Sequence, residues 1–240
     1  MLTNKYLYKK PPYDPLADLT PLVRVCLAPI ALVVTNDVPA QNLQEFMAWL
    51  RANKGKLSYG SYGIGSHGQL ACTTLSDVAG ADMAHVAYKG EAPMIQDLLG
   101  GQIKIGMGSL LSIKAHIDSG RLRALAVTGD RRSTLAPNLP TVAESGLPGY
   151  SSVTWFGLYG PAGMKPELVG RINQAFNRAI QNPEVIASLA KQGVEPAKPQ
   201  TPGQFAAMVR LAAAQAMAVA DDFIADGALA AMGSAFRPGG

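Results

Sequence analysis

Residues 57–78 read LSYGSYGIGSHGQLACTTLSDV, a short strand-like run, a glycine-rich loop and a helical pattern in direct succession. Leu57–Gly60 predicts a strand and Gln69–Val78 predicts a helix, with the loop between them. A strand that leads through a short loop into a helix is the repeating unit of α/β folds. We therefore predict an α/β protein.

The same alternation continues on both sides of this segment. Val, Ile and Leu crowd the expected strands, as a sheet covered on both faces requires, and the short helices between them indicate a mainly parallel sheet. Further strands are expected at residues 32–35, 84–88, 103–107 and 122–128, and further helices at residues 43–51, 92–99 and 111–117.

The second half of the chain does not continue the alternation of strands and helices. Prolines and glycines break residues 131–150 into a loop, and residues 153–159 resume as a strand. Helices are expected at residues 166–180, 183–191 and 203–225, the last of them rich in alanine.

Composition indicates a globular protein and argues against a nucleic-acid partner. Apolar residues make up 48% of the 240, charged residues 16%, and the formal charge is +4. The basic pairs at Lys9-Lys10 and Arg131-Arg132 are too short for a nucleic-acid stripe. Cys26 and Cys72 lie in apolar surroundings, so both are expected in the core, and no apolar run is long enough to span a membrane.

The glycine-rich loop is the sharpest candidate site. Glycines let backbone N–H groups approach a ligand, and the N-terminus of the following helix favours negative charge. Gly63-x-Gly65-x-x-Gly68 also matches a dinucleotide fingerprint, but no carboxylate ends the next strand to hold a ribose. A carboxylate or another small anion suits the loop better. NADP bound with the help of Lys89, and a tight turn without a ligand, stay open as alternatives.

No enzyme constellation is visible. Ser66 and His67 suggest a hydrolase, but the frame lacks the first glycine of GxSxG, and a helix cap explains Ser66 more simply. The histidines show no metal-ligand spacing, and His85 inside an apolar strand is expected to be a core histidine. We predict no catalytic residues, no metal and no cofactor.

Several segments, in order, resemble the Bug (TctC-like) receptors of tripartite tricarboxylate transporters, which are periplasmic solute-binding proteins. The resemblance extends over residues 6–210. It rests on YKKPPYDPLAD at 8–18, YGSYGIGS at 59–66, AYKGEAP at 87–93, DLLGGQ at 97–102, GRLRALAVT at 120–128, LPTVAESGLPGY at 139–150, WFG at 155–157 and PAG at 161–163.

The resemblance implies a periplasmic-binding-protein-like fold of two lobes, a Venus flytrap that closes on an anionic ligand. Residues 1–35 with 151–240 would form the first lobe and residues 36–150 the second. A small carboxylate would be captured for a membrane permease. Ligand-binding residues are expected at Ser61, Tyr62, Gly63, Gly65, Ser66, Gly108, Ser109 and Trp155.

The sequence departs from the family at its beginning. Nothing matches the usual signal peptide, first strand and Pro-Gly-Gly loop, so the first lobe is expected to be incomplete and a periplasmic location rests on the resemblance alone. Gln69 stands where the family often has His, and Gly108 where an Asp is common. A truncated remnant that binds nothing is the alternative function. An incomplete lobe would also favour a homodimer.

Overall fold

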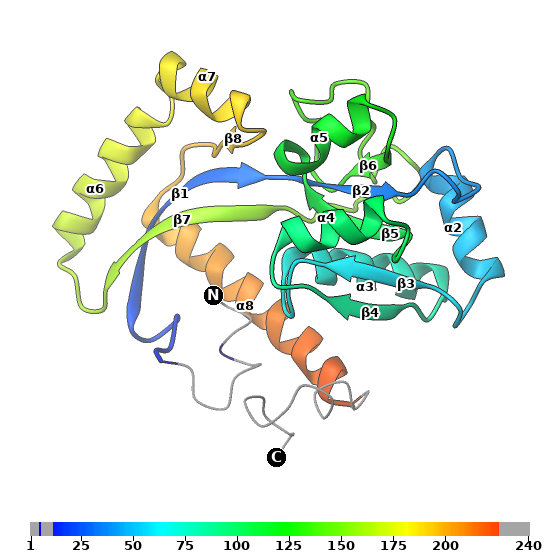
Figure 1. Ribbon diagram of the computed structural model, residues 1–240. Helices are drawn as coiled ribbons and strands as arrows, with labels where there is room; N and C mark the ends of the chain where they lie inside the picture. The colour runs from blue at the N-terminus through cyan, green and yellow to red at the C-terminus, as the bar shows by residue number, and fades with distance from the viewer. Residues whose placement is uncertain (1–4, 6–11, 226–240) are drawn as a thin grey trace. The chain divides into compact units, whose positions relative to one another are not determined.

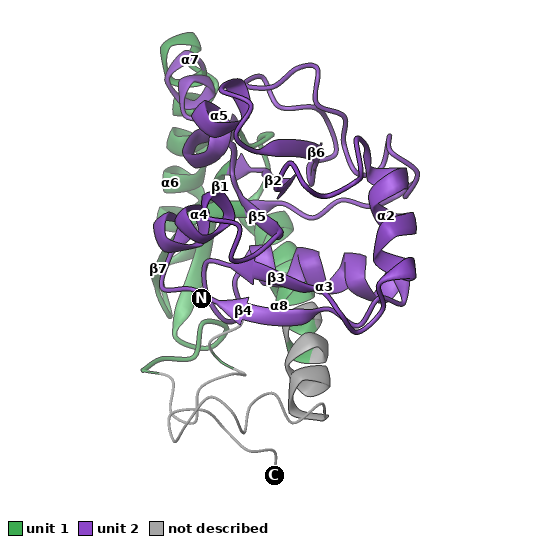
Figure 2. Cartoon of the chain, turned by 45° about the vertical axis from the view of Figure 1, so that its right-hand side comes forward, with its two compact units in different colours: residues 1–26, 155–186, 196–240 green, residues 27–154, 187–195 purple. Residues whose placement is uncertain are grey.

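The computed structural model of the protein describes residue 5 and residues 12–225. It separates into two compact units, shown in different colours in Figure 2. The first unit comprises residues 1–26, 155–186 and 196–240, and the second comprises residues 27–154 and 187–195. The lobes drawn from the sequence remain a prediction, but residues 27–35 fall in the second unit here.

A five-stranded sheet forms the second unit. Its strands are β2 (Ile30–Val34), β3 (Ser58–Ser61), β4 (Ala84–Ala87), β5 (Ile105–Ser109) and β6 (Arg123–Val127), in the order β4-β3-β5-β2-β6. β3 is parallel to β4 and β5, whereas β2 is antiparallel to β5 and β6. Four strands therefore share one direction and β2 runs against them. The apolar run of β2 indicated burial but carried no information about direction.

Helices cover both faces of this sheet (Figure 1). They are α2 (Leu43–Ala52), α3 (His67–Ala79), α4 (Glu91–Leu99) and α5 (Leu110–Asp118). Alternate side chains of β2 point to opposite faces: Leu32 and Val34 join the core beside α2 and α3, whereas Val33 joins the core beside α4 and α5. All five residues of β2 are buried, as the sequence predicted for a central strand.

The first unit is built on a smaller sheet. β1 (Leu19–Ala28), β7 (Thr154–Pro161) and β8 (Glu195–Pro196) follow the order β7-β1-β8, with helices α6 (Pro166–Ala179), α7 (Pro183–Lys191) and α8 (Pro202–Ala225). The three helices lie close to the predicted bounds, but no strand was predicted at β1. Phe205 of α8 is fully buried against β7, and Gly157 leaves room for it, since a Cβ there would lie 2.3 Å from the Phe205 ring.

Two further expectations concern the core and the membrane. Cys26 and Cys72 are both buried and unpaired, which confirms the prediction. Among the residues that the structure describes, no helix has the length and apolar character needed to cross a membrane.

Candidate functional site

The predicted site residues of the second unit gather where β3, β4 and β5 end. Because these three strands are parallel neighbours, their carboxyl ends lie at the same end of the sheet. We call this the carboxyl end of the sheet. The glycine loop, residues 62–66, follows β3, and α5 begins directly after Ser109 of β5. Ligands of open α/β sheets bind at this position.

The glycine loop depends on backbone conformations that favour glycine. Gly63 and Gly65 have φ angles of 151° and 68°, respectively. Gly68, one residue into α3, has no room for a side chain, since a Cβ would lie 2.8 Å from the Tyr62 ring and 3.0 Å from the Met107 carbonyl oxygen. The start of α3 is therefore packed tightly against both Tyr62 of the loop and Met107 of β5.

A partly buried hydrogen-bond network supports the glycine loop. Gly65 N–H donates to Gln69 Oε1 (2.7 Å), and the Gln69 amide nitrogen lies 2.8 Å from His85 Nδ1. His85 Nε2 lies 2.7 Å from Ser61 Oγ, which donates to the Gly63 carbonyl oxygen at 2.9 Å. Ser61 and Gln69 are fully buried. Both ends of the network therefore hold the backbone of the loop.

The donors in this network fix the form of His85. A backbone N–H can only donate, so Gln69 Oε1 must face Gly65 and the Gln69 NH₂ group must donate to Nδ1. Nε2 then carries the proton and donates to Ser61. Burial lowers the pKa of His85 to about 4, so the ring is neutral at neutral pH. His85 is a hydrogen-bonded histidine inside a strand, as predicted, but it is only partly buried and does not belong to the core.

At the start of α3, some backbone donors are bonded and others are available. Ser66 Oγ accepts from Gln69 N–H at 3.3 Å, which confirms Ser66 as the helix cap, and Gly68 N–H donates to Tyr62 Oη at 3.1 Å. Within the described residues, no hydrogen bond occupies the backbone N–H groups of Ile64 and His67. Such free N–H groups at a helix N-terminus attract anions.

The start of α5 is occupied by a carboxylate of the protein itself. Glu91, the first residue of α4, accepts from Ser109 N–H at 2.7 Å and from Ser109 Oγ at 3.1 Å. A Cβ on Gly108 would lie 3.5 Å from Glu91 Oε1. Gly108 and Ser109 thus lie at the carboxyl end of the sheet as expected, but both donors of Ser109 are already bonded.

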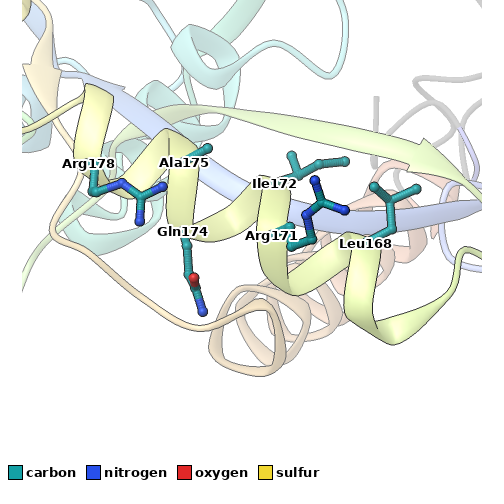
Figure 3. A pocket seen from close by; sticks show the side chains of 6 residues that line it. All are labelled: Leu168, Arg171, Ile172, Gln174, Ala175 and Arg178. Carbon is teal, nitrogen blue, oxygen red and sulfur yellow. The ribbon is translucent and has the colours of Figure 1, made fainter.

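Trp155 belongs to the first unit, where its ring meets Phe205 edge-on with centroids 5.5 Å apart. A shallow hollow of about 360 Å³ also lies in this unit (Figure 3). All of its lining side chains come from α6, so no second element closes it. They are Leu168, Arg171, Ile172, Gln174, Ala175 and Arg178.

The alternative chemistries find little support in this geometry. Two glycines of the dinucleotide fingerprint, Gly65 and Gly68, already donate their N–H groups to Gln69 and Tyr62, so these groups are not available to a dinucleotide phosphate. Ser66 caps α3, and the His67 ring bonds to the Ser152 carbonyl oxygen at 3.0 Å, so the two do not form a nucleophile–base pair. Burial lowers the pKa of His67. Within the described part of the chain, no cluster of three or more His, Cys, Asp or Glu could hold a metal.

Sequence reasoning missed the partners that organise the site. Gln69 and His85 are 16 residues apart, and Glu91 and Ser109 are 18 apart, so no local spacing links either pair. The signal that could have found these partners was the order of strands, because residues that follow neighbouring parallel strands lie at the same end of a sheet.

A family model described as tripartite tricarboxylate transporter family receptor matches residues 1–220. The chain belongs to this receptor family. A curated relative from a Pseudomonas species, named for the tcbD-tcbE intergenic region, is 34% identical over 198 residues, which are 82% of this chain and 59% of the relative. The chain thus spans less than two thirds of the length of that relative.

Solved structures of similar proteins have the same fold. An R. palustris protein solved with adipate has a TM-score of 0.78 at 30% identity, covering 92% of this chain and 74% of its own. The periplasmic binding protein BugD has a TM-score of 0.75 at 29% identity, covering 94% and 75%. The α/β, periplasmic-binding-protein-like fold is confirmed, and the family is one of solute-binding receptors rather than enzymes.

Proposed function

We propose that the protein is a receptor that captures a small carboxylate for the membrane permease of a tripartite tricarboxylate-type transporter. The observation that carries the proposal is the start of α3, where the N–H groups of Ile64 and His67 are unbonded in a glycine loop held rigid from behind. A rigid loop loses little conformational freedom when a ligand binds, which favours affinity.

The ligand carboxylate would sit against the loop, with Ser66 and Tyr62 beside it. The partial positive charge at the N-terminus of α3, a helix of 13 residues, would attract it. Gly63 and Gly65 keep side chains away from the approach, and Ser61 supports the loop rather than facing the ligand, because it is fully buried. Gly108 and Ser109 complete the proposed ligand-binding set of the second unit, and Trp155, which belongs to the first unit, stays a prediction from the sequence.

Location and assembly form the second part of the proposal. BugD is named a periplasmic binding protein, and we place this receptor in the same compartment. We also propose that the first unit pairs with a second copy of the chain. Large apolar side chains are exposed there, including Phe156 at 54% and Leu211 at 61%.

Light scattering tests the pairing with two matched variants. Leu211→Gln in the first unit should shift the protein toward the monomer, whereas Leu111→Gln in the second unit, where the leucine is 56% exposed, should leave the dimer intact. A monomeric parent protein would contradict the proposal.

Thermal unfolding with carboxylates, NADP and no ligand tests the function. A ligand at 100 times its dissociation constant should add about 2.7 kcal/mol of stability. Stabilisation by mono-, di- or tricarboxylates supports the receptor. Stabilisation by NADP alone would favour an oxidoreductase that uses Gly63-x-Gly65-x-x-Gly68. No stabilisation by any of them would favour a remnant of the family that binds nothing.

A further inference from the structure

Two loops at the carboxyl end of the sheet lead into helices, and they offer different things to a ligand. At α3, Ile64 and His67 leave backbone N–H groups unbonded within the described residues. At α5, the N–H and hydroxyl groups of Ser109 both donate to Glu91. The protein therefore has one free anion position and one that its own carboxylate fills.

Glu91 is held in this place by the fold. It begins α4, so its backbone is fixed by the helix, and its carboxylate lies at the start of a second helix of nine residues. Negative charge is favourable at a helix N-terminus. Gly108 leaves the space that Glu91 Oε1 approaches, 3.5 Å from where a Cβ would be. The arrangement thus combines a helix end, two donors and a glycine beside one carboxylate.

The charge of Glu91 also extends to the glycine loop. The pKa of the Tyr62 hydroxyl is raised, chiefly by burial and further by the negative charge of Glu91. Tyr62 itself accepts from the first turn of α3. Because β3 and β5 are neighbouring parallel strands, α3 and α5 begin at the same end of the sheet, and a ligand bound at the start of α3 would lie within the field of Glu91.

We infer that Glu91 selects the ligand: the site takes a carboxylate whose far end is a cation or hydrogen-bond donor, and it disfavours a second carboxylate there. The inference rests on the proposed function. A carboxylate has about four acceptor positions, and Ser109 uses two, so Glu91 can still accept from an ammonium or hydroxyl group. A ligand carboxylate in the same place would meet like charge and find Ser109 already bonded.

Matched ligands of equal length separate these cases. Succinate, glutarate and adipate would each be compared by calorimetry with the ω-amino acid in which an ammonium group replaces one carboxylate. The parent protein should bind the amino acids more tightly than the diacids. Glu91→Gln should reverse this preference, changing the ratio of the two affinities by roughly tenfold or more, as expected for unit charges a few ångströms apart.

Two more variants make the test specific. Glu91→Ala removes the carboxylate entirely and frees Ser109, so diacids should gain affinity there as well, even if Glu91→Gln folds poorly. Glu45→Gln is the control. Glu45 also lies in the first turn of a helix of the same unit, α2. However, α2 follows β2, which runs antiparallel to β5. Glu45→Gln should leave the ratio unchanged.

The outcomes distinguish this inference from the proposed function. If the parent protein binds diacids at least as well as the amino acids, and neither Glu91 variant changes the ratio, carboxylate binding stands and the role of Glu91 is wrong. If none of the compounds binds any of the proteins, while all unfold cooperatively, the role of Glu91 in selecting these ligands is overturned, and thermal unfolding with the wider set of carboxylates decides the receptor function separately.

Discussion

The starts of α3 and α5 have similar positions in the fold, but their hydrogen-bond donors differ: some are free at α3, and those of Ser109 are bonded at α5. Both helices follow parallel strands of one sheet, both are capped by a serine, and both lie at the carboxyl end of the sheet. At α3 the supporting network is partly buried and neutral, and two backbone N–H groups are free within the described residues. At α5 an ionisable carboxylate fills the position.

This difference shows that a helix N-terminus can bind a ligand only when the protein leaves its backbone N–H groups without hydrogen bonds. Both helix N-termini belong to the same strand–loop–helix pattern. They differ only in the side chains that contact them from neighbouring elements. Gln69 bonds both to His85 and to Gly65 of the glycine loop before α3. At α5, the Glu91 carboxylate instead accepts from the N–H group of the capping residue, Ser109. The comparison can be tested at each end with paired substitutions.

Gln69→Leu should have the largest effect on stability. It removes the partners of two partly buried groups, Gly65 N–H and His85 Nδ1, and each unsatisfied group costs about 1–3 kcal/mol. Urea unfolding should show a loss of about 3 kcal/mol in the free energy of unfolding. Ser112→Ala at the α5 end removes an exposed hydroxyl contact and should cost less than about 0.5 kcal/mol. Equal losses would contradict the contrast between the ends.

Gly68→Ala and Gly108→Ala compare the packing of the two ends. The new Cβ at residue 68 would lie 3.0 Å from a backbone oxygen that cannot easily move, so we expect a loss of about 1–3 kcal/mol. At residue 108 the nearest atom, 3.3 Å away, is the terminal methyl of Met94, which can shift. The loss there should be smaller, as measured by the same unfolding transition.

Acid should destabilise the α3 end through His85. Its folded pKa of about 4 lies below the ordinary value of 6.5, so between these values the unfolded chain binds more protons. The stability that His85 contributes is present above pH 6.5 and is lost as the pH falls toward 4. We expect a loss of roughly 2 kcal/mol between pH 7 and pH 5. His85→Gln should flatten this dependence and His116→Gln should not, and an unchanged slope in His85→Gln would be inconsistent with a buried neutral ring.

Of the changes at the α3 end, Ser66→Ala should have the smallest effect. Losing the cap of α3 typically costs about 1 kcal/mol of stability. If the hydroxyl also bonds to the ligand, carboxylate binding should weaken by about 1 kcal/mol or somewhat more. Calorimetry on the folded variant measures the second effect separately, and an unchanged affinity would restrict Ser66 to the role of a cap.

The sequence predicted the local elements well because their signals are local. The spacing of Leu43, Phe46, Met47 and Leu50 predicted α2, and all four are buried. Strand direction was harder: the uninterrupted apolar run of β2 fits either direction, and only pairing with β5 and β6 decides it. β1 was missed altogether, although Leu22 and Val23 are buried within it.

The site was predictable only to the level of its loops. The glycine loop and Ser109 could be placed together because they follow neighbouring strands. Whether the donors of each loop are free depends on Gln69, Glu91 and other side chains whose partners lie 16 or 18 residues away. Such pairings depend on the register of the sheet, which the sequence pattern does not specify.

Backbone amide shifts of histidine-labelled protein test the central claim most directly. The chain has three histidines, His67, His85 and His116, so ¹⁵N-histidine labelling gives one backbone signal for each. During titration with a small carboxylate, the His67 amide should shift and saturate, because its N–H faces the ligand, while His116 on α5 should stay in place. A ligand that binds by calorimetry but leaves His67 unshifted, or shifts His116 equally, would contradict the account.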